Sequence, residues 1–363
     1  MTKEVMIALG TRPETIKMAP VIRALQKYKQ PFSLVHSGQH YDYNLSIQFI
    51  EELNLPRPDH NLRFRESLPA AQTGRIMMGL EKIVKKEKPT LMLIQGDTNT
   101  MLAAALTAFK QNVPVGHIEA GLRSHDWRMP EEHNRRMVDH ASKYLFAPTS
   151  GAKENLKSEN IWGKIFVTGN TVIDAVAQHL PIAEKKSDIM TRINFREYIL
   201  ATAHRAENVD DPRVLRNFVE VFTKAPLPVV FPVHPRTVKR LRKYNLWKKL
   251  ASSKTVQLLP PMGYFDFLIL MKNCELMLTD SGGIQEEATA PPIKKFVLVL
   301  RLSTERPEAV EAGFAKVVGV DKKNILRALS DIVENPPNLQ KRSPFGDGKA
   351  GEKITKIVME ELG

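Results

Sequence analysis

The chain alternates short apolar runs with longer segments of helical periodicity, and this alternation constrains its fold more strongly than any other feature. In the first half, apolar runs that fit β-strands occur at residues 5–9, 32–36, 91–95, 113–118, 144–147 and 165–167. Helical patterns accompany them at residues 13–28, 70–88, 98–111, 132–141, 151–159 and 171–183. Strands that alternate with helices in this way predict a parallel sheet with helices over both faces.

A second series of the same kind follows a charged and polar stretch at residues 181–196, which we interpret as an inter-domain linker. Its strands are predicted at 198–202, 229–233, 255–258, 276–279, 296–300 and 315–318, and its helices at 212–224, 237–244, 264–272, 283–288 and 323–334. The sequence therefore predicts the α/β class, with two doubly wound Rossmann-like domains that face a cleft. We expect them to cover residues 1–183 and 184–348, and the C-terminal helix, within residues 349–363, to pack back on the first domain.

The composition narrows the environment in which the protein works. The single cysteine, Cys274, allows no disulfide within the chain, which fits a reducing compartment. No apolar run approaches the roughly 20 residues that span a bilayer, and the first apolar stretch has no signal-peptide cleavage site. No cluster of cysteine and histidine has the spacing of a zinc site. We therefore expect a cytoplasmic protein that binds neither a metal nor a membrane.

The formal net charge of +13 predicts an affinity for anions, whether nucleic acids, acidic membranes or phosphorylated metabolites. Residues 234–254 carry eight lysines and arginines and no acidic residue. Such a run is usually the solvated face of a helix, and we favour that interpretation over a nucleic-acid patch.

The residues just after each predicted strand carry the chemistry, because ligands of open α/β sheets bind beyond the carboxyl ends of the strands. The first strand ends in G-T-R-P-E, in which Thr11 and Glu14 have the spacing of a helix capping box. Arg12 then stands at a helix N-terminus, where a guanidinium can meet phosphate oxygens, and Lys17 follows in the same helix. The sequence contains neither a G-x-G-x-x-G turn nor a P-loop, which argues against an enzyme that uses a nicotinamide cofactor or hydrolyses ATP.

Three acidic residues follow the next strands, and we expect them to share one rim. Asp97 comes after the strand at 91–95, Glu119 after the strand at 113–118, and Glu131 lies a little further on. A single acid in such a place is usually a cap or an ion-pair partner. Several that converge can raise one another's pKa, which suits general acid–base catalysis.

The second half places histidines and a glycine pair at its strand ends. His204 and His234 follow two predicted strands, each with an arginine nearby, which favours a surface that faces phosphate. The clearest anion site is T-D-S-G-G at 279–283, where Gly282 and Gly283 let backbone amides approach a phosphate. Ser281 belongs to the same predicted anion site. Two further residues complete the predicted ligand-binding residues of the second half: Glu287 can accept hydrogen bonds from ribose hydroxyls, and Arg306 can brace the cleft.

At these residues the sequence resembles the non-hydrolysing UDP-N-acetylglucosamine 2-epimerases. The matching motifs are G-T-R-P-E (10–14), Q-G-D-T (95–98), H-I-E-A-G-L-R (117–123), P-E-E-x-N-R (130–135), H-R-x-E-N (204–208), T-D-S-G-G-I-Q-E-E-A (279–288) and T-E-R-P-E-A (304–309). They span nearly the whole chain in order, so the resemblance is specific.

The resemblance implies the two-domain fold of nucleotide-sugar glycosyltransferases and glycogen phosphorylase, and a reaction in two steps. UDP is eliminated across C1 and C2 to give 2-acetamidoglucal, and it adds back with the opposite configuration at C2. Asp97, Glu119, Glu131 and His204 would be the catalytic residues. Residues that would hold the UDP-sugar are Arg12, Lys17, His234, Phe267, Ser281, Gly282, Gly283, Glu287 and Arg306. The resemblance implies no cofactor or metal, and it suggests a homodimer.

The sequence departs from the family pattern at three places. The segment 289–295 is longer than expected, Met262 stands where many relatives have a glutamine, and residues 39–43 only partly resemble the region that activates bacterial relatives. The alternatives are a 2-epimerase of a related UDP-diacetamido sugar, a hydrolysing epimerase and a UDP-sugar glycosyltransferase. The non-enzymatic alternatives are a UDP-sugar sensor and a nucleic-acid binder.

Overall fold

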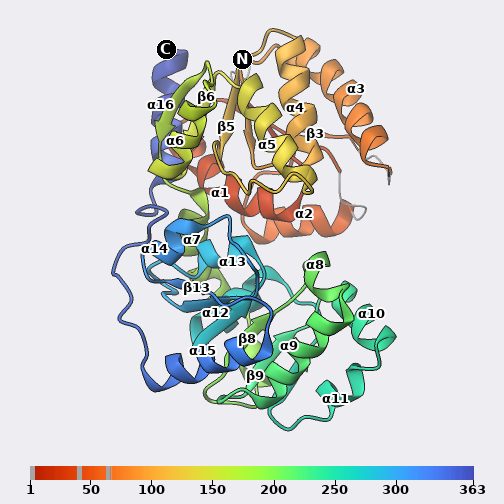
Figure 1. The fold of residues 1–363 in the computed structure, drawn as a ribbon. Helices are drawn as coiled ribbons and strands as arrows, with labels where there is room; N and C mark the ends of the chain where they lie inside the picture. Colours follow the sequence, from red (N-terminus) through yellow and green to blue (C-terminus); the bar gives the residue numbers. More distant parts are fainter. Residues whose placement is uncertain (1–4, 39–42, 63–65, 67) are drawn as a thin grey trace. The chain divides into compact units, whose positions relative to one another are not determined.

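The computed structural model describes residues 5–38, 43–62, 66 and 68–363, and it divides the chain into two compact units (Figure 1). Unit 1 comprises Met1–Ala175 and Phe345–Gly363, and unit 2 comprises Val176–Pro344. The division after Ala175 lies inside helix α7 (Thr171–Lys186), eight residues before the boundary that the sequence suggested. The polar stretch at 181–196 is therefore not an extended linker, because α7 and a 3₁₀ helix (Ile189–Arg192) occupy most of it.

Unit 1 is built on a parallel sheet of seven strands in the order β3-β2-β1-β4-β5-β6-β7. The strands are β1 (Val5–Leu9), β2 (Phe32–His36), β3 (His60–Asn61), β4 (Leu91–Gln95), β5 (Val115–Ile118), β6 (Tyr144–Ala147) and β7 (Lys164–Val167). Every residue of β1, β4 and β5 is buried, as expected for central strands covered on both faces. The two-residue β3 was not predicted, because it has no apolar run.

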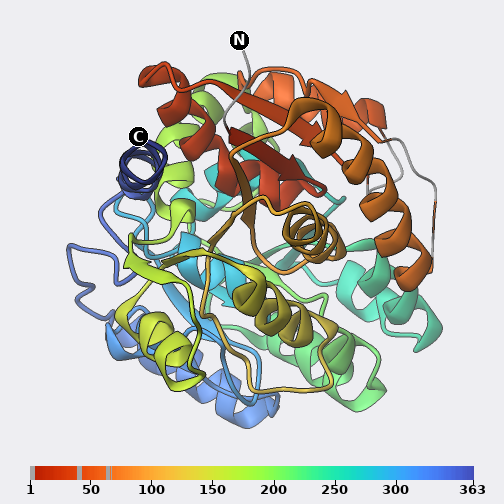
Figure 2. The same ribbon diagram turned by 90° about the horizontal axis from the view of Figure 1, so that it is seen from above.

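Helices cover this sheet at α1 (Arg12–Lys27), α2 (Tyr43–Glu52), α3 (Pro69–Glu87), α4 (Asn99–Lys110), α5 (Pro130–Ala141), α6 (Ser150–Ser158) and α16 (Ala350–Leu362). Helices α3, α4 and α5 pack in sequence against one another, and α16 packs against α1 (Figure 1). Figure 2 shows α16 end-on, in dark blue. The last helix of the chain thus belongs to the unit that contains the first.

Unit 2 has a second parallel sheet of six strands, in the order β10-β9-β8-β11-β12-β13. The strands are β8 (Ile199–Thr202), β9 (Val229–Pro232), β10 (Val256–Leu259), β11 (Leu276–Thr279), β12 (Phe296–Val299) and β13 (Ala315–Val317). Its helices are α8 (Ala206–Val209), α9 (Pro212–Lys224), α10 (Pro235–Lys243), α11 (Trp247–Ala251), α12 (Tyr264–Asn273), α13 (Gly282–Glu287), α14 (Pro307–Glu311) and α15 (Lys322–Glu334). The predicted α/β class and the two Rossmann-like halves are confirmed.

A buried carboxylate fastens α16 to the rest of unit 1. Asp174 accepts hydrogen bonds from the N–H groups of Ala350 (3.2 Å) and Gly351 (2.9 Å), at the start of that helix. A side chain at Gly351 would lie 2.8 Å from a backbone carbon of Pro20 in α1, so only glycine permits this approach. The carboxylate also complements the positive end of the helix dipole.

Asp174 gives the protein a predictable pH dependence of stability. Burial raises its pKa from the ordinary 3.8 to about 6, and the hydrogen bonds from Gly351 and Ala350 offset this only in part. The native state then holds this proton more tightly than the unfolded chain does. The stabilisation is complete below pH 3.8 and is lost as the pH rises through 6.

We therefore expect the free energy of unfolding of the wild type, minus that of Asp174→Asn, to fall between about pH 4 and pH 7. The decrease should reach at most about 3 kcal/mol. Urea unfolding of both proteins across this range measures the difference. A difference that stays constant or increases with pH would contradict the assignment.

Candidate functional site

The predicted site residues of unit 1 lie at one edge of its sheet. Strands β1, β4 and β5 are neighbours in the sheet and run parallel, so their carboxyl ends meet. Arg12 begins α1 shortly after β1, Asp97 follows β4 by two residues, and Glu119 comes directly after β5. The structure thus brings these three strand-end segments together.

Glu119 is a buried carboxylate in an unusual backbone conformation, with φ of +68°. Its Oε1 accepts hydrogen bonds from Lys17 Nζ at 2.5 Å and from Asn170 Nδ2 at 2.9 Å. The side-chain amide of Gln95, at the end of β4, donates to its Oε2. An ammonium and two amides therefore stabilise the ionised form, and the predicted residues Lys17 and Glu119 form one unit.

Asp97 is held by two residues of α5. Arg135 donates from Nε to Asp97 Oδ2 at 2.8 Å, and Asn134 donates from Nδ2 to the Asp97 carbonyl oxygen at 2.8 Å. The Asp97 side chain keeps 30% of its surface exposed, so it can still meet a ligand. The P-E-E-x-N-R motif therefore supplies the residues that orient Asp97, a role that the sequence did not reveal.

The third predicted carboxylate, Glu131, is exposed in the first turn of α5, whereas its neighbour Glu132 is fully buried. Glu132 accepts hydrogen bonds from Ser124 N at 2.8 Å and from Arg135 Nη1 at 3.0 Å. Burial opposes the ionisation of Glu132, but these hydrogen bonds outweigh it and lower its pKa. Glu132 is thus structural, and Glu131 is the acid of this pair that is open to solvent.

The capping box predicted at the first turn is present. Glu14 accepts hydrogen bonds from the N–H groups of Gly10 (2.7 Å) and Thr11 (2.9 Å). Thr98 Oγ1 donates to the other oxygen of Glu14 at 2.5 Å, which ties this turn to the residue after Asp97. Burial raises the pKa of Glu14 although these hydrogen bonds act in the opposite direction.

The exposed guanidinium of Arg12 stacks over Phe49, with Cζ 4.9 Å from the ring centroid.

In unit 2, a buried aspartate organises the predicted histidines. Asp280 accepts hydrogen bonds from the N–H groups of His204 (3.0 Å) and Arg205 (2.9 Å), and His204 Nδ1 lies 3.3 Å from Asp280 Oδ1. The rings of His204 and His234 lie 5.7 Å apart. Burial, with the charges of His204 and Arg236, lowers the pKa of His234. The two strand ends therefore place two imidazoles side by side.

The Ser-Gly-Gly turn lies beside Arg306. Ser281 is the N-cap of α13, and a Cβ atom at Gly282 would lie 3.9 Å from the Arg306 guanidinium carbon. No atom would lie within 4 Å of a Cβ atom at Gly283, so this backbone has open space in front of it. Arg306 is buried and forms an ion pair with Glu286, which fixes its orientation. The turn and the arginine thus make one local cluster.

The other two predicted residues of unit 2 are half-buried, on helices that follow one another in the chain. Glu287 is the last residue of α13, and Phe267 lies in α12, which follows β10. The partial match to the activating region, at residues 39–43, falls mostly on residues 39–42, which lie outside the described part of the chain.

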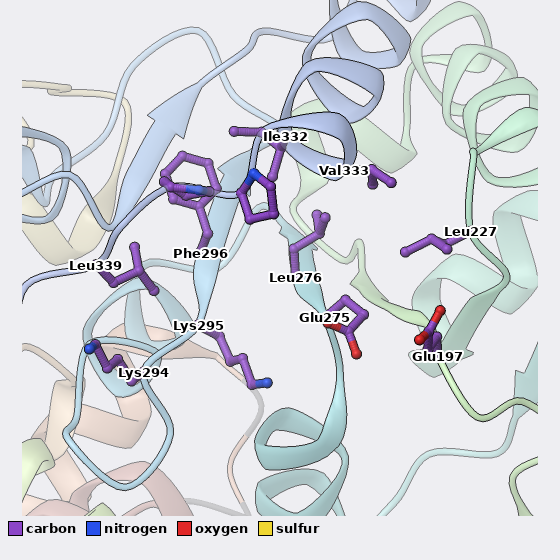
Figure 3. A pocket seen from close by; sticks show the side chains of 12 residues that line it. Glu197, Leu227, Glu275, Leu276, Lys294, Lys295, Phe296, Ile332, Val333 and Leu339 are labelled. Carbon is purple, nitrogen blue, oxygen red and sulfur yellow. The ribbon is translucent and has the colours of Figure 1, made fainter.

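A cavity of about 280 Å³ lies at the opposite end of the strands of unit 2 (Figure 3). Its lining includes Leu276 and Phe296, the first residues of β11 and β12, and none of the predicted site residues. Lys294 and Lys295, from the longer 289–295 segment, also line it. That segment therefore precedes β12, whereas Arg306 follows β12 at the other edge of the sheet.

Within residues 5–38, 43–62, 66 and 68–363, no group of three or more His, Cys, Asp or Glu residues could hold a metal ion. Across the same part of the chain, no helix is long and apolar enough to cross a membrane.

Comparisons with known proteins agree with the motifs. The profile of the family described as UDP-N-acetylglucosamine 2-epimerase matches residues 23–359. The UDP-N-acetylglucosamine 2-epimerase of Methanocaldococcus jannaschii is 47% identical over 97% of this chain and 98% of the relative. A Pseudomonas aeruginosa UDP-2,3-diacetamido-2,3-dideoxy-D-glucuronate 2-epimerase is 37% identical over 98% of this chain and 99% of the relative.

Solved structures show the same likeness. The M. jannaschii enzyme in complex with UDP-GlcNAc and UDP superposes with a TM-score of 0.88 at 47% identity, covering 98% of this chain and 99% of that one. The Neisseria meningitidis enzyme bound to UDP-GlcNAc gives 0.87 at 36% identity, covering 98% and 99%. The two-domain fold that the resemblance implied is confirmed, and the chain belongs to the UDP-N-acetylglucosamine 2-epimerase family.

Proposed function

We propose that this protein is a non-hydrolysing UDP-N-acetylglucosamine 2-epimerase, which interconverts UDP-N-acetylglucosamine and UDP-N-acetylmannosamine. The observation that carries the proposal is the full-length match, at 47% identity, to an enzyme whose structure holds UDP-GlcNAc and UDP. The carboxylates and cations at the strand ends of this chain support it, because they are the groups that the reaction needs.

The first step, loss of UDP from C1, depends on stabilising the departing diphosphate, because the proton at C2 is only weakly acidic. Cations and backbone amides aimed at phosphate oxygens supply that stabilisation. We assign this role to Arg306 and to the Ser281–Gly283 backbone beside it, with Arg12 and Lys17 as further cations. His204 and His234 contribute imidazole N–H groups, Glu287 binds the ribose, and Phe267 contacts the uracil.

The second requirement is a proton transfer at C2 on either face of the sugar, for which we propose Asp97, Glu119 and Glu131. Glu119 accepts three hydrogen bonds from nitrogen donors and is suited to remain an ionised acceptor. Asp97, fixed by Arg135, and the exposed Glu131 are suited to exchange protons with the ligand. No water enters the product, so UDP adds back to the 2-acetamidoglucal intermediate.

The related substrate, a UDP-diacetamido uronic acid, is the second candidate, since the P. aeruginosa relative is named for it. Its lower identity, 37% against 47%, favours UDP-N-acetylglucosamine. A glycosyltransferase would transfer the sugar to an acceptor, and a sensor would bind it unchanged.

We further propose that the protein works in the cytoplasm, where UDP-sugars are made, in keeping with its single, buried cysteine.

The test of the function is incubation with UDP-N-acetylglucosamine in deuterated water, followed by NMR. We expect UDP-N-acetylmannosamine with deuterium at C2. Asp97→Asn, Glu119→Gln and Glu131→Gln should each lower the rate by about 100-fold or more, because each removes a group that transfers or positions a proton. Glu275→Gln, at the opposite end of unit 2, is the matched control and should keep the wild-type rate. Unchanged sugar, or deuterium exchange that survives all three substitutions, would refute the proposal.

The assignment of Arg306 to the diphosphate has its own test. Arg306→Gln should weaken UDP binding by about 10- to 100-fold, the usual cost of losing a hydrogen bond from a charged group. Arg242→Gln removes an exposed arginine on α10 and should leave binding unchanged. Isothermal titration calorimetry measures both. Equal affinities for wild type and Arg306→Gln would show that the phosphates bind elsewhere.

We also propose a homodimer in which α3 and α4 of unit 1 meet a second copy. These adjacent helices expose large apolar side chains, Met78 at 66% and Phe109 at 56%. Exposed apolar surface of this kind is typical of an interface.

Light scattering after size exclusion should give twice the 41.1 kDa chain mass. The double substitution of Met78 and Phe109 by Glu should give the monomer, and Val310→Glu on α14 should not. A wild-type monomer would contradict this proposal.

A further inference from the structure

His117, in the middle of β5, is fully buried, and both of its ring nitrogens contact oxygen atoms. Nε2 lies 2.9 Å from the carbonyl oxygen of Gly96, and Nδ1 lies 2.7 Å from Asp139 Oδ1. A carbonyl oxygen has no hydrogen to donate, so the contact with Gly96 requires a proton on Nε2. The contact with Asp139 requires a second proton, either on Nδ1 or on the carboxyl group.

The surroundings of Asp139 decide where that second proton lies. Arg123 Nη2 is 2.8 Å from Asp139 Oδ2, and the N–H of Gly121 donates to the same oxygen at 3.2 Å. A guanidinium and an amide donor both favour the ionised carboxylate over the neutral acid. The proton therefore belongs on Nδ1, which makes the ring of His117 an imidazolium that donates from both nitrogens.

This imidazolium lies between the two turns that carry the proposed acid–base residues. Gly96, with φ of +87°, directly precedes Asp97 at the end of β4. Gly121, which donates to Asp139, follows Glu119 by two residues. A hydrogen bond at each end of the His117–Asp139 pair therefore connects one of these turns to the other.

We propose that His117, doubly protonated and paired with Asp139, is a positioning residue that sets the separation of the Asp97 and Glu119 turns. The inference rests on the proposed function for the roles of Asp97 and Glu119. A buried ion pair keeps its geometry because separating the charges in the interior is costly. A neutral side chain at residue 117 cannot donate to both Asp139 and the Gly96 carbonyl oxygen, so one of these two hydrogen bonds is lost. The turn that carries Asp97 then shifts relative to the turn that carries Glu119.

Neutron diffraction from a deuterium-exchanged crystal of the wild-type protein tests the protonation state directly. We expect nuclear density for a deuteron on Nδ1 and on Nε2 of His117, and none on the carboxyl group of Asp139. A deuteron on only one ring nitrogen would overturn the proposal. This experiment needs no variant to fold, and its outcome does not depend on the reaction that the enzyme catalyses.

The effect on catalysis is tested with His117→Gln, which can donate from one position only. Its kcat should fall about 100-fold, the cost of a displacement of about 1 Å at a reacting group, with KM and the Kd for UDP unchanged. His60→Gln is the matched control, because His60 lies in the same unit on β3 and its Nε2 contacts Glu87 Oε1 at 2.5 Å. The control should keep the wild-type kcat.

Thermal unfolding of both variants separates stability from positioning. If His117→Gln and His60→Gln lose similar stability and have the same kcat, His117 is only structural and the proposal fails. If the wild type catalyses no epimerisation, the proposed function fails, and the neutron result still decides whether His117 is an imidazolium. If His117→Gln does not fold, the neutron result alone decides.

Discussion

The ionised carboxylate of Glu119 fixes the carboxyl edge of the first sheet. It receives Lys17 from α1, Gln95 from the end of β4, and Asn170 from the segment before α7. A buried charge without partners would cost several kcal/mol, so these donors and the carboxylate require one another. Three segments that are far apart in sequence are thereby held at one point. The positive φ of Glu119 turns its backbone at the end of β5, and this geometry persists because the three donors hold the side chain in place.

Unit 2 uses a buried carboxylate in the same way. Asp280, after β11, accepts hydrogen bonds from the turn after β8 through the N–H groups of His204 and Arg205, and from the Asn208 side chain. Both acids follow a central strand of their own sheet. Glu119 binds the last residue of the neighbouring strand β4, and Asp280 binds the turn that follows the neighbouring strand β8. Backbone amides and side-chain donors replace the water that the carboxylate loses on burial. The strand-end turns are thus ordered by the fold before any ligand arrives, which lowers the entropic cost of binding.

Much of this could be predicted from the sequence, because apolar runs, turn residues and strand-end motifs are local signals. The central strands, the capping box of Glu14 and the positions of the site residues at strand ends follow from such signals. Other features depend on partners far away in the chain. Helix α7 continues through Pro181, and its first residues belong to unit 1 through Asp174. Arg236 and Arg240, in the basic segment 234–254, form ion pairs with Asp210, which lies outside that segment. The positive potential of the segment is therefore weaker than its count of lysines and arginines suggests.

In the function that we propose, the sugar of a UDP-sugar binds at the carboxyl edge of β1, β4 and β5. A crystal structure of the protein with UDP and its substrate measures this most directly. We expect the sugar C2 to lie within hydrogen-bonding reach of the carboxylate of Asp97, Glu119 or Glu131. A sugar bound away from all three carboxylates, for example in the cavity lined by Leu276 and Phe296, would contradict it.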